Sequence, residues 1–154
     1  MNKLAQSKSL NDTRAIARKI LRDVLGRTKR RNGAVVLALC GDLGSGKTVF
    51  TQEIARLLGV AESVISPTFI IERTYKIKKK NFLYLIHIDC YRLRGSAEIN
   101  ALGWSGIVKD PRNIIVVEWA EKIEDVLPKD TTIVCFEHAG ESKREIRTKP
   151  KLKN

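Results

Sequence analysis

The segment Gly41–Thr48 reads GDLGSGKT and matches the pattern GxxxxGK[ST], which is typical of a phosphate-binding loop. Gly44 and Gly46 allow backbone conformations in which several N–H groups point at one centre and cradle phosphate oxygens. Lys47 brings a positive charge to the β- and γ-phosphates, and Thr48 offers a hydroxyl group to Mg²⁺. The motif therefore predicts binding of a nucleoside triphosphate, ATP, together with magnesium.

The elements on either side of the motif favour phosphate binding over a glycine-rich turn with a chance lysine. Ala34–Leu39 is a continuous apolar run, as expected of a strand buried on both faces of a sheet. A helix is predicted from Lys47 to Leu58. A phosphate loop joins such a strand to a helix, because the positive end of the helix helps to bind the anion. We therefore expect ATP to contact Gly41, Asp42, Leu43, Gly44, Ser45, Gly46, Lys47, Thr48 and Val49.

Two carboxylates, Asp89 and Glu118, each follow an apolar run of strand length. Strand ends of this kind are where α/β sheets hold their ligands. Hydrolysis of a nucleotide needs a second group on magnesium and a group that orients water. Both acids are therefore candidates for catalysis and for metal binding. The sequence leaves open which of them holds the metal, which orients water, and whether either simply faces solvent.

The histidines give weaker indications. His87 is expected on the same strand face as Asp89, because side chains two residues apart share a face. A role in proton transfer is conceivable for His87, but a lone strand histidine is more often structural. His138 is expected at the surface, and no His/Cys cluster has the spacing of zinc ligands.

The composition indicates a folded globular protein. The chain has 154 residues, 43% of them hydrophobic, which suits one domain with its own core. No apolar stretch approaches the roughly 20 residues that span a bilayer, and the N-terminus lacks the apolar core of a signal peptide. Cys40, Cys90 and Cys135 lie in or beside apolar runs and are expected to be buried. We therefore expect a soluble, cytoplasmic protein in a reducing compartment, with no membrane contact.

Positive charge is the other compositional signal. The net charge of +12 is concentrated in Arg27–Arg31, Lys76–Lys80 and Lys143–Lys153. Such clusters attract polyanions, among them nucleic acid. Solvated loops and a loose tail explain the same clusters, so the sequence leaves both interpretations open.

The expected architecture is a single three-layer α/β domain over residues 1–154, in which helices flank a mixed parallel and antiparallel sheet. Asn11 or Asp12 is expected to cap a first helix that ends near Leu25. A hairpin turn is expected at Lys78–Asn81, and the basic tail 143–154 is expected to be frayed. The predicted strands are 34–39, 69–78, 82–88, 113–117 and 131–136, and a short helix is predicted at 96–102.

Taken together, these blocks resemble one known family. The segments Gly41–Thr48, Ser66–Phe69, His87–Leu93 and Val117–Trp119 stand in the order and spacing of the TsaE family of P-loop ATPases. The resemblance implies a P-loop NTPase fold and a role in making N6-threonylcarbamoyladenosine in tRNA. It also implies weak ATP hydrolysis with Mg²⁺ that supports a TsaB–TsaD partner complex, in which TsaD transfers the threonylcarbamoyl group.

The resemblance also assigns roles to residues. It implies that Lys47 and Thr48 hold phosphate and magnesium, that Glu118 is the second magnesium-associated acid, and that Asp89 lies in the outer metal shell or beside the attacking water. It places the adenine between Leu10–Thr13 and the region of Lys143 and Arg144. A switch-like or partner-facing role is implied for Ser66, Pro67, Thr68 and Phe69, and site positions, with packing as the alternative, for Tyr91, Arg92 and Trp119.

Some positions depart from the family pattern. Val49 stands where the family often has threonine, which removes a hydroxyl group and is expected to lower hydrolysis without removing binding. Ala120 follows Glu118 and Trp119 where the family usually has proline, which changes the local turn.

Three alternative functions are also compatible with the sequence. A small P-loop kinase shares the phosphate loop, but the sequence shows no arginine-rich lid. An ATP-switched nucleic-acid-binding protein fits the basic clusters, although these clusters lack interleaved aromatic residues for base stacking. A protein that binds ATP without hydrolysing it fits Val49. Contact with tRNA through the basic surface is compatible with the main interpretation.

Overall fold

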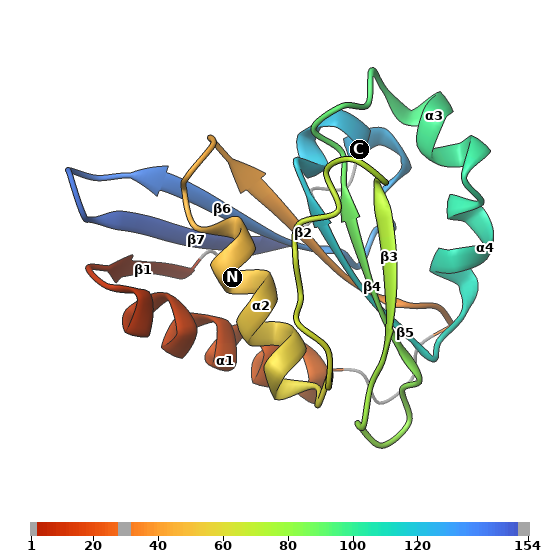
Figure 1. Ribbon diagram of the computed structural model, residues 1–154, viewed down its shortest axis with the longest axis horizontal. Coiled ribbons are helices and arrows are strands. Elements are labelled where there is room, and N and C mark those ends of the chain that lie inside the picture. Colours follow the sequence, from red (N-terminus) through yellow and green to blue (C-terminus); the bar gives the residue numbers. More distant parts are fainter. Residues whose placement is uncertain (1–2, 28–31, 151–154) are drawn as a thin grey trace.

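The protein is built around one seven-stranded sheet with strand order β1-β7-β6-β2-β5-β4-β3. The computed structural model describes residues 3–27 and 32–150. Figure 1 shows α1 and α2 on one face of the sheet and α3 and α4 away from them. The elements are β1 (Lys3–Ser7), α1 (Leu10–Gly26), β2 (Val35–Gly41), α2 (Lys47–Leu57), β3 (Glu72–Lys76), β4 (Tyr84–Asp89), α3 (Ser96–Ala101), α4 (Trp104–Lys109), β5 (Asn113–Glu118), the 3₁₀ helix η1 (Ala120–Val126), β6 (Thr132–His138) and β7 (Arg144–Pro150).

The centre of the sheet is parallel and its edges are antiparallel. Strand β2 lies between β5 and β6 and runs parallel to both, and β4 runs parallel to β5. The side chains of these strands alternate between two hydrophobic clusters. Leu37 and Leu39 pack with α1 and α2, whereas Val36 and Ala38 pack with α3, α4 and η1. Because both faces are covered, the central strands are apolar throughout, and the predicted three-layer α/β architecture is confirmed.

The first helix begins one turn earlier than expected. Ser9 is the N-cap, and its side chain accepts a hydrogen bond from the backbone N–H of Asp12 at 3.1 Å. Asp12 in turn accepts a bond from the backbone N–H of Lys8 at 2.9 Å. The expectation that Asn11 or Asp12 caps the helix is therefore wrong, because a serine three residues before an aspartate can satisfy the free N–H groups reciprocally.

The predicted frayed tail is wrong for residues 144–150. They form β7, which pairs antiparallel with both β6 and β1. Ile146, only 1% exposed, anchors this strand in the core. The sequence pattern did not indicate a strand here, because one face of β7 is polar and carries charged residues such as Glu145 and Arg147. The rest of the predicted tail, 151–154, lies outside the described residues, and β1 was not predicted at all.

The other half of the sheet follows the prediction more closely. Strands β3 and β4 form the expected antiparallel hairpin around Lys78–Asn81. Strand β3 starts only at Glu72, because the chain before it turns at Ile71, where φ is 67°. The short helix predicted at 96–102 is present as α3, whereas α4 and η1 were missed. No helix in the described part of the chain has the length and apolarity to cross a bilayer.

The cysteines only partly follow the expectation that all are buried. Cys90 is buried, whereas Cys40 on β2 and Cys135 on β6 are half-buried register partners on adjacent strands. Because the two thiols are hydrogen-bonded to each other, their pKa values shift in opposite directions. The pKa of Cys135 is lowered to about 7, and the pKa of Cys40 is raised.

Candidate functional site

The connection from β2 to α2 has the backbone path of a phosphate loop. The φ angles are 137° at Gly41, 72° at Gly44 and 105° at Gly46, which lie in the region that favours glycine. Gly46 is the N-cap of α2 and supplies no side-chain hydrogen bond to it. The first N–H groups of α2 are therefore available to an anion, and the helix dipole favours one.

Lys47 lies at the centre of this loop and is only 5% exposed. Its ammonium group donates hydrogen bonds to the carbonyl oxygens of Gly41 and Asp42, the second at 2.9 Å. It also lies 4.2 Å from the ring centroid of Trp119. Burial lowers the pKa of Lys47, and the nearby carboxylates, Glu118 foremost, act in the opposite direction. Among the residues that the structure describes, the ammonium group is thus held at the loop without a direct ion pair to an acid.

Glu118 at the end of β5 contacts polar side chains of two neighbouring elements, α2 and β4. Its Oε2 accepts a hydrogen bond from the Thr48 hydroxyl at 3.4 Å. Its Oε1 accepts one from the Thr51 hydroxyl at 3.4 Å and is hydrogen-bonded to His87 Nε2 at 2.8 Å. Glu118 is 2% exposed and His87 is fully buried. These contacts fix the carboxylate beside the threonine of the phosphate loop.

The sequence did not place His87 in the site. It shares a strand face with Asp89 as expected, but its contact is with Glu118 on the neighbouring strand. The signal that could have found it is the parallel pairing of β4 and β5, in which Asp89 lies opposite Glu118 and His87 opposite Val116. Residues on the same side of adjacent strands meet diagonally, so that a histidine two residues before one acid reaches the other.

Asp89 has a different set of partners. Its Oδ2 accepts hydrogen bonds from the hydroxyls of Ser66 at 2.9 Å and Thr68 at 2.8 Å, and its Oδ1 accepts one from the backbone N–H of Tyr91 at 2.9 Å. Asp89 therefore ties the segment Ser66–Phe69 to the end of β4. In this arrangement it holds a loop beside the phosphate loop.

The segment Ser66–Phe69 has one buried residue, Pro67, and one strongly exposed residue, Phe69, whose exposed fraction is 84%. The Arg92 guanidinium lies 4.5 Å from the ring centroid of Phe69. Tyr91 and Trp119 form an aromatic pair with centroids 5.1 Å apart. Aromatic and cationic groups thus surround the mouth of the site.

A cavity of about 410 Å³ connects these groups. Leu10 and Thr13 from the start of α1 line one side of it. Its full lining is Leu10, Thr13, Leu43, Gly44, Ser45, Gly46, Lys47, Thr48, Val49, Ser66, Thr68, Asp89, Tyr91, Glu118, Trp119 and Arg144. Of the predicted site residues, the lining leaves out Gly41, Asp42, Pro67, Phe69, Arg92 and Lys143.

Arg144 lines this cavity in place of its neighbour Lys143. Its Nη2 donates to the Gly44 carbonyl oxygen at 3.4 Å, and among the described residues its buried Nε has no hydrogen-bond partner. Lys143 is exposed, just before β7 begins. Side chains alternate between the two faces of β7, and Arg144 shares a face with the buried Ile146. This explains why Arg144 and not Lys143 lines the cavity.

The residues present fit a magnesium ion bound with a triphosphate. Mg²⁺ prefers oxygen ligands and is usually held by one or two protein oxygens together with phosphates and water. The Thr48 hydroxyl and the Glu118 carboxylate supply such oxygens within hydrogen-bond distance of each other. The start of α2 and Lys47 supply the positive charge that phosphates need.

Comparison with known proteins agrees with this arrangement. The family model "Threonylcarbamoyl adenosine biosynthesis protein TsaE" matches residues 7–146. The TsaE protein of Bacillus subtilis (strain 168) is 40% identical over 111 residues, which are 72% of this chain and 66% of that protein. The TsaE protein of Treponema pallidum (strain Nichols) is 32% identical over 123 residues, covering 80% and 86%.

A solved structure points in the same direction. The crystal structure of YdiB from Bacillus subtilis superposes with a TM-score of 0.68 at 30% identity, covering 97% of this chain and 86% of that one. The family match extends from the end of β1 into β7 and includes every cavity-lining residue named above. The chain belongs to the TsaE family of tRNA threonylcarbamoyladenosine biosynthesis proteins.

Proposed function

We propose that this protein is an Mg²⁺-dependent ATPase that supports a TsaB–TsaD complex in forming N6-threonylcarbamoyladenosine in tRNA. The observation that carries the proposal is the convergence of Lys47, Thr48 and Glu118 in one cavity at the start of α2. Such a site stabilises negative charge on a transferring phosphoryl group. Modification of tRNA in turn fits a cytoplasmic location.

Each residue has a distinct part in the proposed reaction. The backbone N–H groups of the loop and Lys47 bind the phosphates, and Thr48 and Glu118 hold the magnesium ion. When bound, the ion neutralises charge on the β- and γ-phosphates. His87 and Thr51 orient the Glu118 carboxylate through their hydrogen bonds.

Of the two acids, Asp89 is the better candidate for responding to the γ-phosphate. It accepts hydrogen bonds from the hydroxyls of Ser66 and Thr68, and both of these residues line the cavity. A phosphate that competes for these hydroxyls loosens the segment from Asp89 and alters its outer surface. Asp89 thereby links nucleotide state to the exposed residues around Phe69, and it orients water from the same position.

The adenine is proposed to lie between the start of α1 and the start of β7. Leu10 offers an exposed apolar side chain, and Arg144 offers a guanidinium plane with a buried Nε donor. Thr13 is fixed by a hydrogen bond to Ser7 at 2.7 Å, so that this wall is rigid. The base site thus depends on Arg144 and leaves Lys143 outside.

The rim of the cavity suits a protein partner. Exposed fractions of 78% at Leu43, 84% at Phe69, 61% at Ile70 and 47% at Tyr91 are high for side chains of this size. Apolar groups gathered around a polar site mark an interaction surface. Among the described residues Arg144 is the only arginine that lines the cavity. A partner that docks on this rim is therefore proposed to complete the catalytic site.

The fate of the γ-phosphate tests the reaction class. Incubating the protein with γ-labelled ATP and Mg²⁺ and separating the products is expected to give free phosphate, and chelation of Mg²⁺ is expected to stop its release. Label that appears on an added small-molecule acceptor would instead support a kinase. Bound nucleotide with no phosphate release, with or without TsaB–TsaD, would mean a nucleotide-sensing protein.

A further inference from the structure

The exposed side of α1 carries a row of cations that the proposed ATPase does not use. Arg14, Arg18 and Arg22 are four residues apart, so they follow one another along the same side of the helix at intervals of about 6 Å. Lys19 lies beside this row, and Arg27 follows at the C-cap. These five residues, together with Lys3 of β1, are called the α1 basic face.

Within the described residues, the acids nearby neutralise only part of this face, because they pair with Lys3 and Arg18. Asp23 is paired with Lys3 at 2.6 Å. The buried Glu53 of α2 is held mainly by Arg56 at 2.8 Å and only distantly by Arg18 at 3.5 Å. Asp12 is bound to the backbone N–H of Lys8.

Lys19, Arg22 and Arg27 therefore keep their positive charge available. Within the described ranges none of these side chains forms an ion pair. The Arg14 side chain donates only to the Asn11 side-chain oxygen, at 3.4 Å. A face with several uncompensated cations attracts a polyanion over a distance of about a Debye length.

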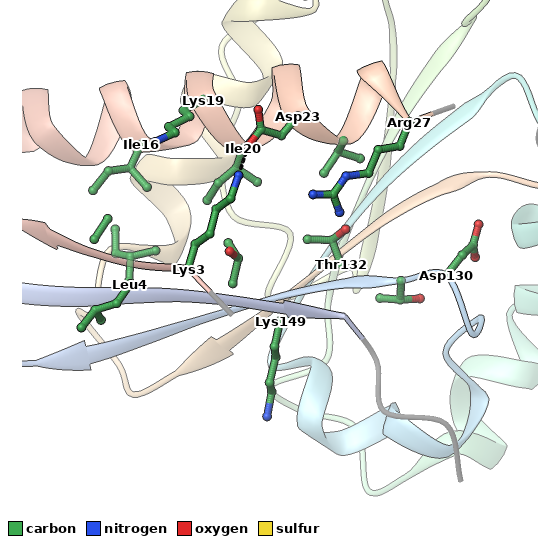
Figure 2. A pocket seen from close by; sticks show the side chains of 15 residues that line it. Lys3, Leu4, Ile16, Lys19, Ile20, Asp23, Arg27, Asp130, Thr132 and Lys149 are labelled. Atoms are coloured by element: carbon green, nitrogen blue, oxygen red, sulfur yellow. Dashed lines mark hydrogen bonds and ion pairs between the residues drawn. The ribbon is translucent and has the colours of Figure 1, made fainter. Parts of the chain in front are cut away.

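A groove lies beside part of this face and is lined by its Lys3, Lys19 and Arg27, whereas Arg14 and Arg18 line a separate pocket against α2. Figure 2 shows it between α1 and the strands β1, β7 and β6, with Lys3, Lys19 and Arg27 on the α1 and β1 side and Thr132 opposite. Its volume is about 310 Å³. The Thr131 hydroxyl, which lines it, is 1% exposed and has no hydrogen-bond partner among the described residues. That hydroxyl is buried in the groove wall, and the groove lining also includes the side chains of Thr132 and Thr148 and two carboxylates, Asp23 and Asp130.

We propose that the α1 basic face and its groove bind the ribose–phosphate backbone of RNA, with tRNA as the natural ligand. Guanidinium groups bind phosphate oxygens with two parallel hydrogen bonds, and threonine hydroxyls are common partners of phosphate and sugar. The inference rests on the proposed function, since it assigns to the chain a contact with the RNA that the pathway modifies. It gives a role to Arg27, which the proposed nucleotide site does not use.

The surface chemistry favours RNA over an acidic protein or a lipid bilayer. Protein interfaces have an apolar centre, but within residues 3–27 and 32–150 Leu4 is the only strongly exposed large hydrophobic residue that lines the groove. A helix that lies on a membrane presents apolar residues outward. The apolar side of α1, with Ala17, Leu21 and Val24, is instead buried against the sheet and α2.

The face also lies apart from the nucleotide cavity along the same helix. Leu10 and Thr13 at the start of α1 line the nucleotide cavity, whereas the groove begins at Ile16 and extends to Arg27. RNA binding can therefore be tested by substitutions that do not touch the nucleotide site.

The experiment measures fluorescence anisotropy of a labelled, unmodified tRNA transcript mixed with this protein alone, across a series of salt concentrations. The test variant is Lys19→Glu/Arg22→Glu. The control is Lys79→Glu/Lys80→Glu, which makes the same change in net charge on exposed lysines of the β3–β4 turn. Binding of a fluorescent ATP analogue by each variant verifies that it is folded.

The α1 variant is expected to bind tRNA about tenfold more weakly near 0.1 M salt, and its slope of log affinity against log salt should fall by about 2. The control should stay within about twofold of the unchanged protein. Equal tRNA affinity in both variants, or no binding by the unchanged protein, would overturn the inference. Competition by polyglutamate or phosphatidylserine vesicles as strong as that by unlabelled tRNA would do so too. Because no ATP or partner is present, this failure is distinguishable from failure of the ATPase.

Discussion

Glu118 is the residue on which the site depends most. It receives hydrogen bonds from Thr48 and Thr51 on α2 and is joined to His87 on β4, so that one carboxylate connects the phosphate loop to the sheet. Lys47 reaches the loop carbonyls from the other side. Single substitutions can therefore separate the role of the Lys47 charge from the role of the Glu118 carboxylate.

Lys47→Ala and Glu118→Gln are expected to differ in their effects. Loss of the ammonium group should weaken ATP binding at least about tenfold, since a charge-assisted hydrogen bond contributes about 1.5–3 kcal/mol. Glu118→Gln keeps the shape of the side chain and should spare ATP binding while lowering hydrolysis on the order of a hundredfold. Titration with a fluorescent ATP analogue and a phosphate-release assay measure the two quantities. Equal affinities and equal turnover in the two variants would refute the assignment.

His87 is expected to act through Glu118. His87→Ala removes the 2.8 Å contact and leaves Oε1 with the longer bond from Thr51. Hydrolysis should fall about tenfold or more with ATP affinity nearly unchanged, and His87→Gln should restore part of the rate because its amide reaches a similar position. If His87 were purely structural, the melting temperature would be lower in both His87→Ala and His87→Gln, and the two variants would hydrolyse ATP at the same rate.

At the scale of elements, the phosphate loop depends on close contact between β2 and β6. A Cβ atom on Gly41, where φ is 137°, would lie 2.5 Å from the Phe136 carbonyl oxygen. This backbone contact cannot be relieved by rotating a side chain. The loop geometry is therefore coupled to the stability of the neighbouring strand.

Gly41→Ala is accordingly expected to lower the free energy of unfolding by about 2 kcal/mol or more, and to weaken ATP binding. Urea unfolding measures the first effect. Gly106→Ala in α4 is the matched control, since nothing lies within 4 Å of its added Cβ and alanine suits a helix better by about 0.5–1 kcal/mol. If Gly41→Ala were as stable as the control, the contact with Phe136 would be irrelevant to the fold.

Strand β7 yields a second prediction at this scale. Ile146→Ala should lower the free energy of unfolding by about 2–4 kcal/mol, because the side chain is buried in the core beneath α1. Lys149→Ala on the same strand is exposed and should change it by less than about 0.5 kcal/mol. Chemical denaturation of both variants is the measurement, and equal stability would mean that this part of the chain is frayed in solution.

The contrast between these elements shows what the sequence could predict. Strands β2 and β5 were found because their apolar runs have no other explanation, and α2 because the phosphate loop requires a helix after it. Strand β7 was missed because Ile146 is isolated among charged residues and one of its two partners, β1, lies at the opposite end of the chain. The contact of His87 with Glu118 and the position of Arg144 in the cavity were not predicted for a similar reason, since both depend on strand pairing.

At the scale of the whole molecule, one end of the parallel strands holds the proposed nucleotide site, and its rim carries the exposed side chains of Leu43, Phe69 and Ile70. The side formed by α1 is basic. We propose a different partner for each surface, a protein complex at the rim and RNA along α1. Helix α1 contributes to both, because it begins at the nucleotide cavity and ends at the groove.

We propose that ATP hydrolysis by this protein depends on the partner complex. Phosphate release from ATP and Mg²⁺ should be measured for this protein alone and with purified TsaB–TsaD, with Lys47→Ala as the control. We expect weak activity alone, strong stimulation by the partners, and loss of that stimulation in Lys47→Ala. Full activity of the isolated protein that the partners leave unchanged would contradict it.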